Sequence, residues 1–336
     1  MNTKVAEDNP FRRWINLAQP RLGAEVVYAT DEFFASRERL ISPLEPIFIA
    51  DKYDEHGKWM DGWESRRRRD AGYDYCIVRL AVPGVVYGFD IDTAHFTGNY
   101  PPSASIDGCV DDNPIPGDAA AWEELVPSVR LRGNSHHYHA SQRNARYTHL
   151  RLNIYPDGGV ARLRVYGEVR PDWQALAAQG EIDLLAMENG GRALICNDEH
   201  FGSMHNLIAP GRGVNMGDGW ETQRRRTPGY DWVILALGTP GIVKQVVIDT
   251  AHFKGNYPDR ASLRGVRLAG GNEDELAAQS LAWLVLLPEM KLTMDAEHSF
   301  TDELQDIGPV SHVRLSIFPD GGVSRLRLFG RPAADT

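Results

Sequence analysis

The chain contains one long segment twice, and this duplication limits its fold more than any other feature. Residues 62–108 align without a gap with residues 219–265, and 27 of the 47 positions are identical. Residues 149–167 align with residues 312–330, with 13 of 19 positions identical. Each copy is long enough to have its own hydrophobic core. We therefore predict two similar domains, 15–170 and 182–332.

The copies differ mainly in two loops. The offset between them is 167 residues near their starts, 157 in the middle and 163 near their ends. The first copy therefore has a longer loop around 44–61, and the second has a longer loop around 268–282.

The sequence pattern within each copy predicts strands. Residues 149–167, HLRLNIYPDGGVARLRVYG, alternate apolar and polar side chains on both sides of a Pro-Asp-Gly-Gly turn, which predicts a hairpin. We interpret this turn, at 156–159 and again at 319–322, as structural. Residues 75–80 and 85–91 are two more predicted strands, separated by a turn at Pro83 and Gly84.

The whole pattern predicts an all-β fold of two tandem jelly-roll β-sandwich domains, with at most a short helix per repeat. One such helix is expected to begin at Pro171 and Asp172 and to continue over 174–185. The sequence has no GxGxxG or Walker loop, and long helices do not alternate with its strands.

Composition excludes several classes of protein. A net charge of −10 gives the DNA backbone no overall attraction, so no nucleic-acid partner is expected. No segment has the apolar length of a membrane span, and the N-terminus lacks the apolar stretch of a signal peptide. Three cysteines without a CxxC pair predict reduced thiols in a cytoplasmic protein. The oligomeric state is open, and a homo-oligomer is one of the states allowed.

A first polar cluster is Gly-Trp-Glu followed by arginines, at 62–69 and again at 219–226. A guanidinium group can bind a carboxylate through two hydrogen bonds. A run of arginines can also be a solvated surface with structural ion pairs. The glutamate and three arginines, however, keep their register through both copies, which favours a shared site.

A second cluster is Asp-Thr-Ala-His-Phe, continued by Gly-Asn-Tyr-Pro, at 92–101 and 249–258. Asp, His and Asn can transfer protons and recognise amides. On a continuous strand Asp92 and His95 would point to opposite faces, so they can converge only if the chain turns between them. The alternative is a loop held together by its own Asp and Asn side chains.

A third cluster, Asn134 to His139, has three histidines in four residues. Imidazole is a common metal ligand, but only His137 recurs, as His298 in the second copy. We interpret His137 as a polar residue at the rim of a site, and the sequence predicts no metal ligands. A divalent metal could activate water, but the sequence does not require a cofactor.

Together these segments resemble the allantoicase (allantoate amidinohydrolase) family. The resemblance rests on DGWESRRRR, DTAHFTGNYP and PDGGVARLRVYG, on their second-copy forms DGWETQRRR, DTAHFKGNYP and PDGGVSRLRLFG, and on the paired segments TDEFFAS and NDEHFGS. It covers nearly the whole chain in order. In the second copy Gln223 replaces one arginine, and Thr222 stands where the first copy has Ser65.

The resemblance implies a hydrolase of purine catabolism that converts allantoate, an anionic ureide, and water to ureidoglycolate and urea. It also implies jelly-roll domains similar to galactose-binding modules. The residues expected to transfer protons are Glu64, Asp92 and His95, with Glu221, Asp249 and His252 in the second copy. The residues expected to bind substrate are Arg67, Arg68, Asn99 and His137, with Arg224, Arg225, Asn256 and His298. Whether one copy or both are active is open, and so is which residue is the acid and which the base.

Two alternatives remain from the sequence. A non-catalytic jelly-roll module could bind a small anion or a sugar, although it would have little need for Glu, Asp and His in both copies. A metal-dependent hydrolase of another acyclic ureide is the second alternative.

Overall fold

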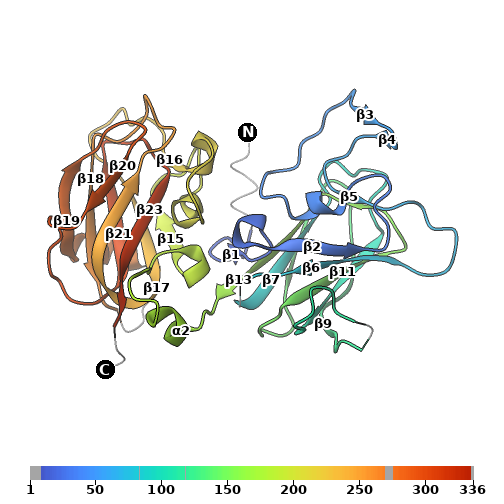
Figure 1. The fold of residues 1–336 in the computed structure, drawn as a ribbon. Coiled ribbons are helices and arrows are strands. Elements are labelled where there is room, and N and C mark those ends of the chain that lie inside the picture. Colours follow the sequence, from blue (N-terminus) through green and yellow to red (C-terminus); the bar gives the residue numbers. More distant parts are fainter. Residues whose placement is uncertain (1–8, 83, 118, 269–274, 334–336) are drawn as a thin grey trace. The chain divides into compact units, whose positions relative to one another are not determined.

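A computed structural model describes residues 9–82, 84–117, 119–268 and 275–333. The chain divides into two compact units, Met1–Arg170 and Pro171–Thr336. Each unit is built of antiparallel strands in layers, as Figure 1 shows. In the described part of the chain, no helix has the length and apolar character needed to cross a membrane.

The first unit consists of two packed sheets. Its strands are β1 (Ile15–Asn16), β2 (Glu25–Ala29), β3 (Tyr53–Asp54), β4 (Gly57–Lys58), β5 (Trp63–Glu64), β6 (Asp74–Arg79), β7 (Gly84–Asp92), β8 (Ser103–Cys109), β9 (Glu123–Arg130), β10 (His136–Ala140), β11 (His149–Tyr155), β12 (Gly159–Val160) and β13 (Arg162–Val169). One sheet has the order β1-β13-β7-β10 and the other the order β2-β6-β11-β8-β9. Side chains that alternate along the strands fill the core between the sheets, among them Phe89, Ile91, Leu150 and Leu152, all fully buried.

The second unit repeats this plan. Its strands are β14 (Ile182–Asp183), β15 (Arg192–Cys196), β16 (Trp220–Glu221), β17 (Asp231–Asp249), β18 (Arg260–Val266), β19 (Leu284–Lys291), β20 (Glu297–Phe300), β21 (Val310–Phe318), β22 (Gly322–Val323) and β23 (Arg325–Pro332). The long strand β17 corresponds to β6 and β7 together. Its first part pairs with β15 and β21, and its second part pairs with β23 and β20. The all-β prediction is confirmed.

The predicted strands at 75–80 and 85–91 are β6 and β7, and each of the four ends differs from the prediction by one residue. Pro83, in the predicted turn between them, lies outside the described residues.

The predicted hairpin at 149–167 is wrong. Strand β11 pairs with β6 and β8, whereas β13 pairs with β7 and β1 in the other sheet. The Pro-Asp-Gly-Gly segment therefore carries the chain across the core from one sheet to the other. The apolar alternation on each side is real, but the two strands bury their apolar faces in one core from opposite sides.

The predicted helix at 171–185 is much shorter in the structure. Helix α2 (Trp173–Ala177) begins as expected, since Asp172 accepts hydrogen bonds from the backbone of Gln174 and Ala175. It ends before Gly180, whose φ of 100° is incompatible with a right-handed helix, and β14 follows. A second short helix, α3 (Leu276–Gln279), lies in the longer loop of the second copy.

Candidate active site in the first repeat

Glu64 and Asn99 come from different motifs and meet in the structure. The Nδ2 atom of Asn99 donates a hydrogen bond to Oε1 of Glu64 at 2.7 Å. In the second repeat Asn256 donates to Glu221 in the same way. The Gly-Trp-Glu segment and the Asp-Thr-Ala-His-Phe-x-Gly-Asn segment therefore share one region in each repeat.

A buried tryptophan fixes the position of Glu64. Trp63 is fully buried in β5, and its Nε1 donates to the carbonyl of Asp31 at 2.8 Å. Glu64 is only 9% exposed, and this burial raises its carboxyl pKa, while the hydrogen bond from Asn99 opposes the rise. A carboxyl group whose pKa is shifted upward toward neutrality is suited to proton transfer.

The Pro-Asp-Gly-Gly segment contacts both Glu64 and Asn99 through its backbone. Strand β12 pairs with β5, opposite Glu64, and the backbone N–H of Gly159 donates to the carbonyl of Asn99 at 2.7 Å. A Cβ atom on Gly159 would lie 2.0 Å from the ring of Phe96, so only glycine fits there. The second repeat has the same contacts from Gly322. The turn thus contacts the motif that carries Asn99. Its interpretation as a purely structural turn did not predict this contact.

His95 turns the chain after β7. Its φ of 67° lies in the left-handed region, which is uncommon for a residue with a Cβ atom, and His252 repeats it at 71°. The backbone N–H of His95 donates to Oδ1 of Asn134 at 2.9 Å. Ring atom Nε2 lies 3.1 Å from the carbonyl of Pro46. Because a carbonyl can only accept, Nε2 carries a hydrogen, and Nδ1 of the neutral ring is the atom able to accept a proton.

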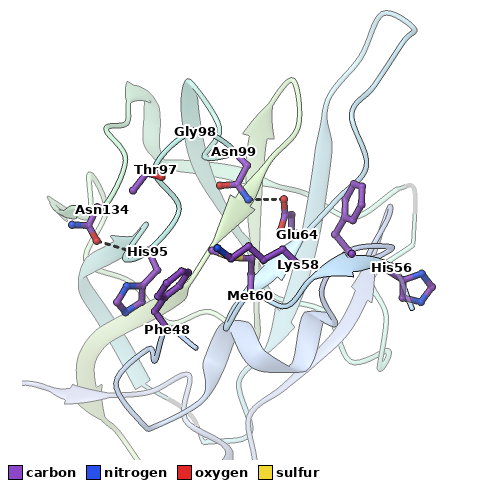
Figure 2. Close-up of a pocket in the computed structure, with 12 residues that line it drawn as sticks. Phe48, His56, Lys58, Met60, Glu64, His95, Thr97, Gly98, Asn99 and Asn134 are labelled. Atoms are coloured by element: carbon purple, nitrogen blue, oxygen red, sulfur yellow. Dashed lines mark hydrogen bonds between the residues drawn. The ribbon is translucent and has the colours of Figure 1, made fainter. Parts of the chain in front are cut away.

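These side chains line an open pocket of about 660 Å³, drawn in Figure 2. One wall comes from the two repeated motifs, with Glu64, His95, Thr97, Gly98 and Asn99, and with Asn134 beside them. The rest of the lining comes from the loop that is longer in the first repeat, with Phe48, His56, Gly57, Lys58 and Met60, and from Phe34.

Asp92 is not brought into this pocket. Its Oδ1 atom accepts from the backbone N–H of Ala94 at 2.8 Å, so it shapes the turn that follows β7. Burial raises the pKa of Asp92 to about 6, and within the described residues its Oδ2 atom has no hydrogen-bond partner. The equivalent Asp249 forms an ion pair with Arg212 at 3.0 Å.

The arginine run lies outside the pocket lining. The guanidinium of Arg68 pairs with the buried Asp74 at 2.7 Å and with Asp70 at 3.0 Å, and Arg225 pairs with Asp231 in the second repeat. Arg67 and Arg224 are exposed. The structure therefore gives Arg68 and Arg225 ion pairs inside their own units, where the sequence predicts contacts to a substrate.

His137 also has partners within the protein. Its Nδ1 atom donates to the carbonyl of Ile91 at 2.8 Å, and its Nε2 atom accepts from the backbone N–H of Arg132 at 2.9 Å. His298 makes the matching contacts with Ile248 and Thr293. Both ring nitrogens are used to fasten the loop, and neither histidine lines the pocket.

The neighbouring histidine is part of an ion pair. His136 donates from Nδ1 to Asp90 at 2.8 Å, and this hydrogen bond raises the pKa of His136 to about 9. Over the ranges that the structure describes, no three His, Cys, Asp or Glu side chains lie together as metal ligands would.

Sequence reasoning missed the wall that the longer loop provides. Phe48, Lys58 and Met60 occur in the first copy alone, so a search for residues kept in both copies passes over them. The loop's unequal length was the available signal.

Two tandem β-sandwiches, each with a hydrogen-bonded Glu–Asn pair and a left-handed His on the same repeated motifs, define a duplicated all-β protein. The allantoicase repeat model matches residues 15–170 and 182–333. A probable allantoicase of Burkholderia pseudomallei is 58% identical over 323 residues, 96% of each chain. A probable allantoicase of Ralstonia nicotianae is 58% identical over 319 residues, 95% of each chain.

Solved structures agree. The crystal structure of allantoicase from Saccharomyces cerevisiae has a TM-score of 0.81 and 37% identity, covering 96% of this chain and 94% of that one. Another allantoicase structure has a TM-score of 0.82 and 36% identity, covering 98% and 96%. The chain belongs to the allantoicase family, as its motifs suggested.

Proposed function

We propose that this protein hydrolyses allantoate to ureidoglycolate and urea in the pocket of its first repeat. Membership of the allantoicase family supports the reaction. The observation that carries the location is the convergence of Glu64, His95 and Asn99, from both repeated motifs, on one pocket.

The reaction breaks a bond between the α-carbon of allantoate and one ureido nitrogen. A base removes the N–H proton of the ureido group that stays, and its electron pair forms a C=N bond. The pair of the breaking C–N bond moves to the departing nitrogen, which takes a proton from an acid and leaves as urea. Water then adds to the C=N carbon and yields ureidoglycolate. One base, one acid and an amide-recognising group are enough for these steps.

The pocket residues match these requirements. Glu64 and His95 are the two proton-transfer groups, one acting as base and the other as acid. The pKa of Glu64 is raised by burial, and the free ring nitrogen of His95 is Nδ1. Asn99 holds Glu64 through its Nδ2 atom, which leaves its amide oxygen to accept from a ureido N–H.

The remaining sequence candidates have other roles in this proposal. Asp92 and His137 hold the loops around the pocket, and Arg68 holds the loop after β5. The corresponding residues of the second repeat, Asp249, His298 and Arg225, do the same. Arg67 and Arg224 are exposed and take no part in the chemistry.

The test is urea release by purified protein supplied with allantoate. We expect urea and ureidoglycolate in equal amounts, and no product from heat-inactivated protein. Binding of allantoate in calorimetry without urea release would instead indicate a binding module. Dialysis against a chelator before the assay tests the alternative of a metal-dependent hydrolase, because such an enzyme would lose its activity.

A further inference from the structure

We propose that Lys58, on the β3–β4 hairpin in the loop that is longer in the first repeat, binds the carboxylate of the substrate, a contact for which the second repeat has no equivalent lysine. The proposal rests on the proposed function and adds to it the group that recognises the anion.

The pocket needs a positive charge for an anionic substrate, and the arginines do not supply it. Among the described residues that line the pocket, Lys58 is the only lysine or arginine. Figure 2 shows its side chain extending into the pocket beside Glu64 and Asn99. No carboxylate forms an ion pair with Lys58 in the described part of the chain, so its ammonium group is available to a ligand.

Neighbouring contacts hold this lysine toward the reacting groups. Lys58 ends the β3–β4 hairpin, paired with Tyr53. Its Nζ atom lies 4.5 Å from the centre of the Phe48 ring, and the Phe48 ring stacks on His95 at 5.7 Å. Because the carbonyl of Pro46 also contacts His95, the loop is fixed to the proton-transfer histidine at two points. The ammonium group thus belongs to the same pocket as Glu64 and His95.

The second repeat keeps the proton-transfer residues and lacks this charge. Its segment in place of 44–61 is ten residues shorter, and no residue there corresponds to Lys58. Arg212 in that segment is paired with Asp249 at 3.0 Å. Lys254 replaces Thr97, but its side chain is 73% exposed and lies 3.6 Å from Asp295. Both cations therefore pair with carboxylates of their own repeat, which compete with an anionic substrate for them.

The experiment compares Lys58→Gln and Lys58→Arg with wild type, using allantoate and its neutral α-carboxamide analogue. Lys52→Gln is the matched control, because Lys52 lies on the same loop over the Trp59 ring and does not line the pocket. For Lys58→Gln we expect KM for allantoate to rise about 10- to 100-fold, the range for one hydrogen bond to a charged group, with kcat changed much less. KM for the carboxamide should stay unchanged, so the preference for the carboxylate collapses.

Lys58→Arg should retain part of the preference, and Lys52→Gln all of it. Unfolding temperatures near that of wild type show that the variants are folded. If Lys58→Gln does not fold, the KM of Lys58→Arg for allantoate provides the test. An unchanged KM for allantoate in Lys58→Gln, with wild-type turnover intact, would overturn this inference alone. Absence of urea release by the wild type would overturn the proposed function and this inference with it.

Discussion

The amide of Asn99 donates a hydrogen bond to Glu64 across 35 positions of sequence, and Asn256 and Glu221 form the same pair in the second repeat. This contact joins the two motifs that survived duplication. In the first repeat it also favours the ionised form of the glutamate and so opposes the burial that raises the pKa of Glu64.

Replacing Asn99 by Ala should therefore raise the pKa of Glu64 further and lower activity. We expect kcat/KM to fall at least about tenfold, as for the loss of one hydrogen bond to a charged group, and the limb of the pH profile that Glu64 sets to move to higher pH. Asn256→Ala removes the same bond from the second repeat and should leave the profile unchanged. An identical effect of the two substitutions would contradict the difference between the repeats.

Gly159→Ala tests the contact between the Pro-Asp-Gly-Gly turn and the motif that carries Asn99. The added Cβ atom would meet the Phe96 ring at 2.0 Å, so the ring or the turn must move. Such overpacking typically destabilises a protein by about 1–3 kcal/mol. Gly322→Ala creates the same clash with Phe253, and both variants should lose similar stability in denaturant unfolding. Activity measured on the folded fraction should fall in the first variant and persist in the second.

Arg68→Lys keeps the charge and loses the planar guanidinium that reaches Asp74 and Asp70. We expect a fall of a few degrees in Tm with KM close to that of wild type. Arg225→Lys should have the same effect, since Arg225 pairs with Asp231. A large rise in KM with unchanged Tm would restore Arg68 to the substrate-binding role that the sequence suggests.

The prediction for Arg68 shows what the sequence alone could establish. Duplication identifies positions that are needed, but a buried ion pair and a substrate contact preserve an arginine equally well. The strands β6 and β7 and the tandem β-sandwich follow from apolar alternation, which depends on local sequence. The hairpin at 149–167 fails because Pro-Asp-Gly-Gly specifies a turn and leaves open which sheet the next strand joins.

Lys58 illustrates the opposite limit. Its loop is present in one copy only, so comparison between the copies discards it, although it forms a wall of the pocket. The sequence predicted that the motifs of Glu64 and Asn99 share one site. Its geometry depends on Trp63 and Gly159, whose roles appear only when the chain is folded.

His136 should make stability depend on pH. Its pKa in the folded state, about 9, is above the ordinary histidine value of 6.5 because it donates to Asp90. The stabilisation is therefore fully present below about pH 6.5 and is lost as pH rises through about 9. We expect about 1–2 kcal/mol over this window, less than the full shift implies, because 24% of the side chain is exposed and water screens the pair.

The measurement is the free energy of unfolding between pH 6 and pH 9.5 for wild type and His136→Gln. The glutamine cannot be protonated, so the variant should lose this part of the slope. Parallel curves for the two proteins would show that the ion pair contributes nothing.

The central claim, that allantoate is hydrolysed in the pocket of the first repeat, is tested most directly by urea release from Glu64→Gln and Glu221→Gln. Both substitutions replace a carboxyl that accepts a hydrogen bond from an asparagine. We predict that Glu64→Gln lowers kcat about 10²- to 10⁴-fold, the usual contribution of a general acid or base, while Glu221→Gln keeps wild-type activity. Wild-type activity in Glu64→Gln, or its loss in Glu221→Gln alone, would contradict the account.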